Sequence, residues 1–296
     1  MTLDFMNERG IPLDQQTFTW RDLVRTPISK LNDDAFTRAR VQVMVALEGE
    51  AVRFQHDCAR ANGQLRLPLA RVRRVEHHQH TLVHWLMPPD MSPLETSIGL
   101  EQTVVEVTAA LALQEPDPYL AQVYRFAMLE DFDHIYRYAA LYDRVEGKDA
   151  NNILQSYTDI LPGRPTIEEH RAPEDDLRTP YDRLTANPLS KLNALTLLAA
   201  EHQGRDYFAS IGPLLADPVA RQLYAEIVSI EEQHVTQADA MIDPDETWLE
   251  KWLLHEAAEV YCYYSCLNGE PNKRLREIWE RFLAYELGQL HFVMDL

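Results

Sequence analysis

The chain has 296 residues, of which 46% are hydrophobic and 25% are charged, and only 10 are glycine. This composition is typical of a soluble, mostly helical protein. The formal net charge of −19 argues against nucleic acid or an anionic membrane as a partner, because both are negatively charged themselves. Cys58, Cys262 and Cys266 provide neither a disulfide framework nor a Cys-x-x-Cys site, which favours a cytoplasmic location. The sequence shows no export signal and no apolar run of membrane-spanning length, so we expect neither export nor a membrane span.

The first third of the chain predicts an arm followed by helices. Residues 1–32 carry little periodicity, and we expect them to form a surface arm. Residues 33–62 show an apolar repeat of helical period and predict an amphipathic helix. Residues 76–84 are rich in histidine, and His80 and His84 are spaced to clamp a metal ion. No further ligands are evident nearby, so we favour a partly exposed helix face or packing against the bundle.

Four long helices are predicted in the middle of the chain, and a further pair at its end. Ser92-Pro93-Leu94-Glu95 starts the first of them, with a capping serine, a proline at the first helical position and an acidic third position. Residues 144–188 contain five prolines and many charges and predict a long crossover, in which we expect Glu168-Glu169-His170 to be solvated. The predicted helices span residues 93–113, 118–143, 189–211, 217–241, 246–267 and 271–295.

Two pairs of a carboxylate and a histidine three residues later stand one hundred residues apart. Residues three apart share one helix face, so both side chains of a pair can reach the same metal ion. A further carboxylate stands thirty residues upstream of each pair, and a turn halfway between them returns both ligands to the same level. Four carboxylates and two histidines in one layer of a bundle form the ligand set of a di-iron or di-manganese centre. The predicted ligands are Glu101, Asp131, His134, Glu201, Glu231 and His234.

The helical neighbours of each carboxylate predict which one faces inward. Asp131 lies on the apolar stripe of its helix, whereas its neighbour Glu130 lies beside charged residues, so Asp131 is predicted to face the core. The same argument selects Glu231 over Glu232. Buried carboxylates without partners are costly, and two metal ions would satisfy four at once. The alternative is a core of carboxylate–histidine pairs with buried water, which does not explain the matched spacing.

Two residues close to the predicted ligands each have two interpretations. Tyr138 follows His134 by four residues and faces the same layer, where it could be redox-active or simply a core tyrosine with a hydrogen-bonded hydroxyl. Gly204 follows Glu201 by one turn, at a cost of about 1 kcal/mol relative to alanine. It could leave space for oxygen or a substrate beside the metals, or it could allow close helix packing.

The last helix pair carries a faint echo of the same motif in Glu256, Glu259, Glu286 and His291. The five-residue step from Glu286 to His291 does not keep one helix face. We therefore interpret these four residues as core-edge or surface groups.

On these residues, the segment 93–241 resembles the ferritin-like di-iron carboxylate superfamily, which includes rubrerythrins, bacterioferritins and ribonucleotide reductase small subunits. The resemblance implies an all-α fold, a ferritin-like four-helix bundle with a long crossover and extra N- and C-terminal helices. It also implies that Asp131 and Glu231 bridge two metals, that Glu101 and Glu201 are terminal ligands, and that each histidine binds one metal. The first motif departs from the family in having Asp where Glu is usual, which shortens one bridge.

The expected organisation has three parts that form one compact domain. Residues 1–92 are an N-terminal arm with helices packed on the bundle, residues 93–241 are the di-metal bundle, and residues 242–296 are a C-terminal helical pair. The resemblance implies two iron ions, or iron and manganese, in an oxidoreductase that uses O2 or peroxide and an external electron donor to oxidise a small organic substrate. The alternatives are a ferroxidase, iron-handling or peroxide-scavenging protein, and a helical scaffold with a structural or degenerate metal site. A homodimer is compatible with the sequence.

Overall fold

The structure, a computed structural model, describes residues 3–166 and 171–296. Within these ranges every regular element is helical, which confirms the all-helical prediction. The helices group into two compact units. The terminal unit comprises Met1–Ile28, Arg40–Met87 and Asp245–Leu296, and the central unit comprises Ser29–Ala39 and Pro88–Pro244. The helices that precede residue 88 therefore group largely with those that follow residue 244.

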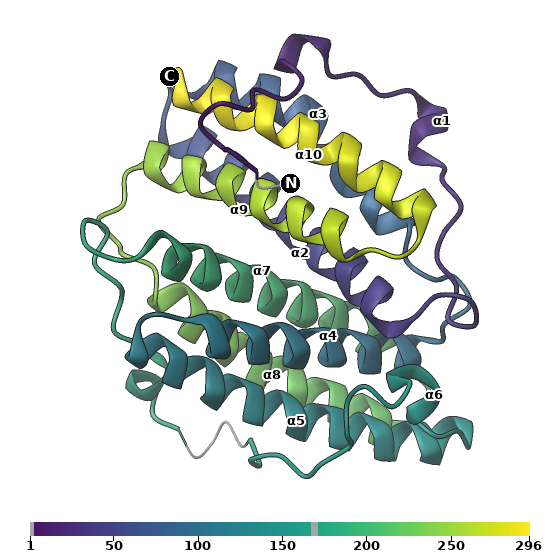
Figure 1. Ribbon diagram of the computed structural model, residues 1–296. Coiled ribbons are helices and arrows are strands. Elements are labelled where there is room, and N and C mark those ends of the chain that lie inside the picture. The colour runs from purple at the N-terminus through teal and green to yellow at the C-terminus, as the bar shows by residue number, and fades with distance from the viewer. Residues whose placement is uncertain (1–2, 167–170) are drawn as a thin grey trace. The chain divides into compact units, whose positions relative to one another are not determined.

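Four long helices form the central unit and pack as a bundle (Figure 1). Helix α4 packs along α5, and α7 packs along α8; contacts of α4 with α7 and of α5 with α8 join the two pairs. The apolar core between them includes Ile98, Ile135 and Ile227, all fully buried. All four predicted helices are confirmed, with ends that differ by at most a few residues. Their bounds are α4 (Pro93–Gln114), α5 (Pro118–Glu146), α7 (Pro188–Ile211) and α8 (Pro218–Ala240).

Each of these four helices begins in the same way. A proline occupies the first helical position, where its missing N–H has no helical partner to lose. The residue before it is a capping residue whose side-chain oxygen accepts a hydrogen bond from a backbone N–H of the first turn. Such a cap contributes about 1 kcal/mol to helix stability. The capping pairs are Ser92-Pro93, Asp117-Pro118, Asn187-Pro188 and Asp217-Pro218.

The predicted crossover connects α5 to α7 and contains two short helices, α6 (Asn151–Leu154) and η3 (Pro173–Asp176). At Gly163 it lies directly against the backbone of α5. A Cβ at this position would stand 2.3 Å from the carbonyl oxygen of Leu129 and 2.4 Å from the backbone nitrogen of Asp133. Only glycine permits this approach, so the crossover is fixed at one point on α5.

Cationic side chains hold the same segment against α5. The backbone N–H of Arg164 also donates to the carbonyl oxygen of Leu129, at 3.0 Å. Three guanidinium groups of the crossover lie over the ring of Phe126, at 4.5 Å for Arg164 and at 5.5 Å for both Arg171 and Arg178. A cation over an aromatic face is stabilised by the negative face of the ring. Arg164, Arg171 and Arg178 of the crossover are therefore positioned by side-chain packing as well as by backbone contact.

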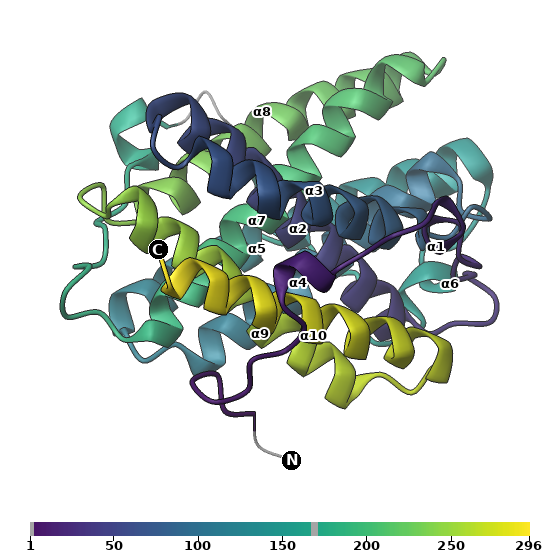
Figure 2. The same cartoon turned by 90° about the horizontal axis from the view of Figure 1, so that it is seen from above.

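The terminal unit contains four longer helices, which also lie beside one another (Figures 1 and 2). Helix α9 packs along α10, as predicted for the last antiparallel pair. Apolar side chains from these helices share one core, which includes Phe54, Leu69 and Trp252. The predicted helices over 33–62, 246–267 and 271–295 are confirmed. The bounds are α2 (Ala35–Ala61), α3 (Arg66–Trp85), α9 (Trp248–Gly269) and α10 (Lys273–Met294).

The N-terminal arm lies along α10, and from residue 3 onward its only helices are the short η1 (Leu13–Gln15) and α1 (Trp20–Leu23). The Ile11 N–H donates to a carbonyl oxygen of α10 at 2.7 Å. Where the arm crosses α10, a Cβ at Gly288 would stand 1.8 Å from the Ile11 carbonyl oxygen. This crossing requires glycine and fixes the arm on the helix surface.

The histidine-rich segment lies on α3. His77 and His78 direct their Nδ1 atoms at carbonyl oxygens of the preceding turn, at 2.9 and 2.8 Å. The rings of His80 and His84 are 5.8 Å apart, and within the described ranges neither belongs to a group of residues that could hold a metal ion. The favoured interpretation of a partly exposed helix face agrees with this arrangement.

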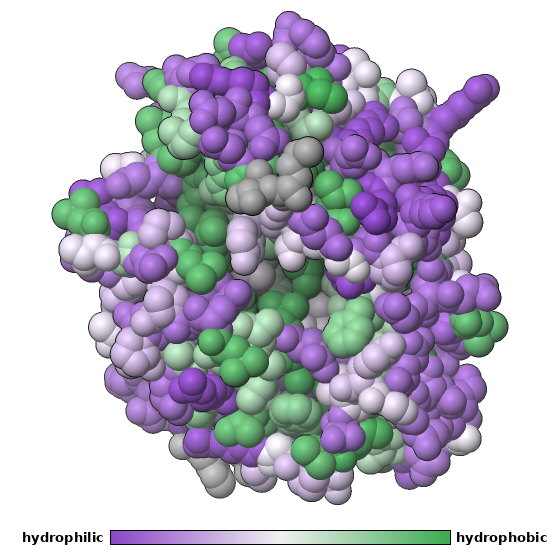
Figure 3. All heavy atoms as spheres, in the orientation of Figure 1, coloured by the Kyte–Doolittle hydropathy of each residue, from purple (hydrophilic) through white to green (hydrophobic). Residues whose placement is uncertain are grey.

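Hydrophilic side chains spread over much of the face seen in Figure 3, with apolar ones among them. Of the helices that the structure describes, none is both long enough and apolar enough to cross a membrane. The predicted solvated segment Glu168-Glu169-His170 lies outside the described residues.

Candidate metal centre

The six predicted ligands come together inside the central unit. Each of the four long helices contributes at least one of them, and all six side chains are buried. Four of the residues offer ligand atoms that lie within 4.8 Å of one another, a group that could hold a metal ion: Asp131, His134, Glu231 and His234. Glu101 and Glu201 flank this group. An oxygen of Glu101 lies 3.5 Å from His134 Nδ1, and an oxygen of Glu201 lies 3.5 Å from His234 Nδ1.

Both imidazole rings present the same nitrogen to the carboxylates. His134 Nδ1 lies 2.8 Å from Glu231 Oε1, and His234 Nδ1 lies 3.5 Å from Asp131 Oδ1. The two rings are nearly parallel, with an interplanar angle of 24° and centroids 5.5 Å apart. The layer is therefore built symmetrically, with one imidazole from α5 and one from α8 facing the same set of carboxylates.

The outward nitrogen of His234 has a buried acidic partner that the sequence analysis did not identify. His234 Nε2 lies 3.0 Å from Glu130 Oε2, and the other oxygen of Glu130 pairs with the guanidinium group of Arg171 in the crossover. Asp131 faces the ligand layer, as predicted. Glu130 is nevertheless fully buried, because it stands behind His234 instead of facing solvent.

The outward nitrogen of His134 also meets a residue of the crossover. His134 Nε2 lies 3.4 Å from Thr166 Oγ1, and this hydroxyl donates to Asp133 Oδ2 at 3.4 Å. Thr166 is buried although it belongs to a segment without regular structure. Outer partners of this kind fix the orientation and tautomer of a histidine that binds a metal. No motif in the sequence points to Thr166 or Arg171, since a crossover without periodicity gives no indication of which residues turn inward.

Several polar atoms of the layer have no hydrogen-bond partner among the described residues. Both oxygens of Asp131 and both oxygens of Glu201 are in this state, as is Glu101 Oε1. Buried polar groups are almost always hydrogen-bonded, because an unmet donor or acceptor costs free energy. Carboxylate oxygens and imidazole nitrogens directed at a common point fit a bound metal ion.

The pKa values of the buried groups also indicate that the layer favours bound positive charge. Burial raises the pKa of Glu101 to about 7 and raises that of Asp131 well above its usual range. Burial opposes the charged form of His134, but Glu101 and Glu231 together outweigh it, so the pKa rises to about 10. His234 behaves in the same way, with Glu201 as the main opposing group, and its pKa also rises to about 10. Protons would therefore occupy this layer when no metal ion is bound.

Tyr138 and Gly204 both lie close to the layer. The ring of Tyr138 is fully buried against Phe208 and Tyr224, at centroid distances of 5.3 and 5.0 Å. Its hydroxyl has no hydrogen-bond partner in the part of the chain that the structure describes, and burial raises its pKa well above the usual value. At Gly204 a Cβ would stand 3.6 Å from Glu231 Oε2, an ordinary contact distance. Room for one methyl group therefore exists beside Glu231.

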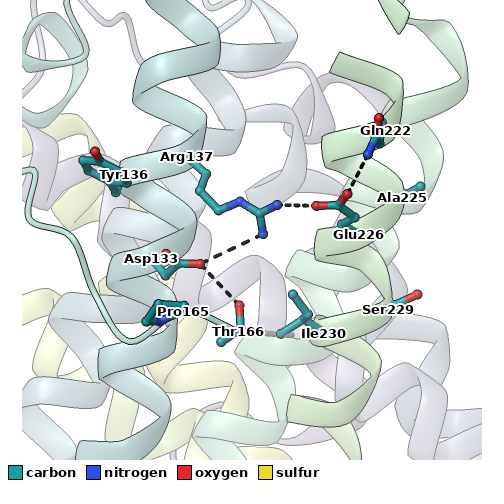
Figure 4. A pocket seen from close by; sticks show the side chains of 10 residues that line it. All are labelled: Asp133, Tyr136, Arg137, Pro165, Thr166, Gln222, Ala225, Glu226, Ser229 and Ile230. Atoms are coloured by element: carbon teal, nitrogen blue, oxygen red, sulfur yellow. Dashed lines mark hydrogen bonds and ion pairs between the residues drawn. The ribbon is translucent and has the colours of Figure 1, made fainter. Parts of the chain in front are cut away.

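A pocket of about 760 Å³ lies next to the layer, between α5, α8 and the crossover (Figure 4). Arg137 projects into it from α5 and pairs with Glu226 of α8; it also lies 4.0 Å from Asp133. Thr166, which contacts His134, forms part of the pocket wall. The pocket therefore reaches a side chain that touches a predicted ligand.

The glutamates of the last helix pair are not core-edge or surface groups, and that interpretation is wrong. Glu256, Glu259 and Glu286 are at most 1% exposed, because α9 and α10 turn this face into the core of the terminal unit. Together with Glu76 of α3 they form a second group that could hold a metal ion. His291 is also buried but lies apart from them, since its Nδ1 is 3.0 Å from a guanidinium nitrogen of Arg9 in the N-terminal arm.

Comparison of the chain with protein-family models, with curated proteins and with solved structures found no match in any of the three. The functional interpretation therefore depends on the geometry of the two buried groups.

Proposed function

We propose that the central unit is a ferritin-like di-metal carboxylate bundle and that the chain is an oxidoreductase that uses O2 or peroxide to oxidise a small organic substrate. The observation that supports this most is the burial of four carboxylates and two imidazoles in one layer, with ligand atoms that lack partners. This is the donor set of di-iron and di-manganese carboxylate proteins. Hard oxygen donors combined with imidazole favour iron or manganese.

The proposed ligands follow the layer. Glu101, Asp131, Glu201 and Glu231 would supply oxygen atoms, and the two histidines would supply Nδ1. Two ions held there would supply the electrons that reduce O2 or peroxide. The fourfold negative charge of the ionised carboxylates is balanced by two divalent ions, which explains how the core tolerates these groups.

The outer partners prepare both histidines for this role. Glu130 pairs with Arg171 and accepts hydrogen bonds only, so the His234 nitrogen that faces it carries the proton. The Thr166 hydroxyl donates to Asp133, so its oxygen is left to accept a hydrogen bond from His134 Nε2–H. In each neutral imidazole the lone pair is then on Nδ1, which faces the carboxylates. The crossover thus selects the tautomer that can bind a metal.

The pocket beside the layer is the proposed substrate site. Its volume of about 760 Å³ is within the range of small-molecule sites. The guanidinium group of Arg137 projects into the pocket and pairs with Glu226. A carboxylate or phosphate of the substrate could take the place of Glu226 in this pair. We therefore expect an organic substrate with an anionic or strongly polar group.

The experiment that tests this proposal is oxygen consumption by protein loaded with Fe²⁺ in the absence of air and then mixed with O2. The matched control is the double variant Glu231→Ala, His234→Ala, which removes two ligands of the layer and leaves the second buried group intact. The proposal predicts fast O2 consumption in the native protein and slow consumption in the variant. Equal rates in the two proteins would contradict it. Release of oxidised iron in amounts beyond two ions per chain would favour the iron-handling alternative.

A further inference from the structure

A second layer of buried carboxylates lies inside the terminal unit, and the proposed function does not use it. Five glutamates from four helices are at most 1% exposed. Four of them place an oxygen within 4.8 Å of one another. Burial of one unpaired carboxylate is already costly, and five in one core demand a compensating charge. The residues are Glu48 of α2, Glu76 of α3, Glu256 and Glu259 of α9, and Glu286 of α10.

Four of these carboxylates are held in the same manner. In each, a neutral donor binds Oε1, whereas Oε2 has no hydrogen-bond partner within the described residues. Glu259 lacks a partner on both oxygens. A carboxylate that accepts a hydrogen bond on one oxygen and has the other oxygen free of protein partners suits a metal site, because the outer hydrogen bond orients the ligand. The donors are Tyr263 Oη for Glu48, Gln55 Nε2 for Glu76, Trp252 Nε1 for Glu256, and Gln79 and Gln289 Nε2 for Glu286.

Two buried amides complete the layer and provide an observation independent of the acidic groups. Gln289 Nε2 donates to Glu286 Oε1 at 3.2 Å and to Gln79 Oε1 at 3.0 Å. Gln289 is fully buried at the carboxylates, and its own Oε1 has no partner among the residues described. Amide and carboxylate oxygens are the ligands that hard cations prefer.

No side chain in the described part of the chain supplies the compensating charge. Across residues 3–166 and 171–296, no lysine, arginine or histidine pairs with any of the five glutamates. Either protons or a bound cation must therefore neutralise the layer. Protons would be shared as O–H···O hydrogen bonds between neighbouring carboxyl groups, whereas a cation would bind the inward oxygens of the ionised groups, so the two alternatives differ in metal binding.

The arrangement repeats the one in the central unit. In the terminal unit, a glutamate is followed about thirty residues later by a second glutamate with a glutamine three residues beyond it. Glu48 precedes the Glu76–Gln79 pair by 28 residues, and Glu256 precedes the Glu286–Gln289 pair by 30 residues. The glutamines, Gln79 and Gln289, stand where the central unit has its histidines. Each unit thus places four helices around one polar layer, with imidazole in one unit and amide in the other.

We propose that the polar layer of the terminal unit is a second metal site, made of oxygen ligands alone, that binds a hard divalent cation such as Mn²⁺. Glu76, Glu256, Glu259 and Glu286 are its ligands, and Glu48 lies at its edge. The absence of imidazole makes it more selective for hard cations than the central layer. The proposal does not depend on the oxidoreductase function.

The test uses the full chain with the central layer disabled, as the variant Glu231→Ala, His234→Ala. Mn²⁺ binding to this background is measured by electron paramagnetic resonance and by calorimetric titration. A second protein adds Glu259→Gln and Glu286→Gln, which keep side-chain size and remove two charges. The matched control adds Glu50→Gln instead, at a buried glutamate of α2 that pairs with Arg53 outside the layer.

The expected result is about one Mn²⁺ per chain in the background protein and in the Glu50 control, with affinity reduced by roughly tenfold or more in the Glu259, Glu286 variant. Without metal that variant should melt no lower than the background, because neutral amides relieve the repulsion between carboxylates. A folded background protein that binds no Mn²⁺ at millimolar concentration would overturn the proposal and leave protons as the neutralising species. Undiminished binding in the Glu259, Glu286 variant would overturn the ligand assignment.

Discussion

Single residues behind the histidines decide whether the central layer can bind metal. Glu130 has the firmest contact, because its two oxygens join His234 to Arg171. Glu130 and its neighbour Asp131 are both buried on α5, but they have different roles. The carboxylate of Asp131 faces the layer, and that of Glu130 sets the proton on the imidazole.

Glu130→Gln tests this role with little change in volume. An amide can donate to His234 as well as accept, so it no longer imposes the tautomer, and Arg171 loses the negative charge of its partner. We expect metal affinity to fall by roughly 10- to 100-fold, measured by competition against a chelator. Glu232→Gln on the exposed face of α8 is the control and should bind as the native protein does. An unchanged affinity in Glu130→Gln would show that the tautomer is set by other means.

Gly204→Ala separates the two interpretations of that glycine. The methyl group fits, since its nearest neighbours are at 3.5 Å and beyond, and alanine favours the helix by about 1 kcal/mol. We therefore expect a higher melting temperature. Slower reaction with O2 in this more stable variant would indicate that the space serves oxygen or substrate. An unchanged rate would show that the space beside Glu231 serves neither oxygen nor substrate.

Competition between protons and metal gives the central layer a defined pH dependence. The raised pKa of about 10 for His134 and His234 means that both are protonated in the metal-free protein near neutral pH, and Glu101 gains a proton as pH falls through about 7. Metal binding must release these protons, so the apparent affinity should fall as pH is lowered from about 8 to about 6. Calorimetric titration in buffers of different ionisation enthalpy measures the release. Binding without proton release would contradict the assignment.

At the scale of elements, the crossover is part of the site rather than a passive connection. Gly163 fixes it on the backbone of α5, and the guanidinium groups over Phe126 hold it there. Thr166 and Arg171 are placed by these contacts. Displacement of the crossover should therefore affect both histidines at once.

Gly163→Ala tests this dependence. Its Cβ would overlap backbone atoms of α5, so the crossover must move, and we expect a loss of about 1–3 kcal/mol in the free energy of unfolding together with weaker metal binding. Chemical denaturation and metal titration of the same variant measure the two effects. Gly63→Ala, where a Cβ meets nothing within 4 Å, is the control. Loss of stability without loss of metal affinity would show that the crossover does not position the ligands.

At the scale of the whole chain, spacing predicted much of the structure and of the central layer. Regular thirty-residue intervals and the capped start at Ser92-Pro93 identify helices of the central unit, because both follow from local geometry. Glu130, Thr166 and Arg171 could not be found in this way, since their roles depend on a crossover whose path has no repeat. The second layer was missed for another reason. Glutamine is not a typical metal ligand, and in the sequence the residues of the central unit separate Glu48 from Glu286.

Whether the central layer binds metal is measured by the metal content of purified protein, determined by mass spectrometry after expression with iron and manganese. The native chain is compared with the variant Glu231→Ala, His234→Ala. We expect about two fewer metal ions per chain in the variant, because it lacks a bridging carboxylate and a histidine of the central layer. The same metal content in both proteins, or no metal in the native chain, would contradict the account.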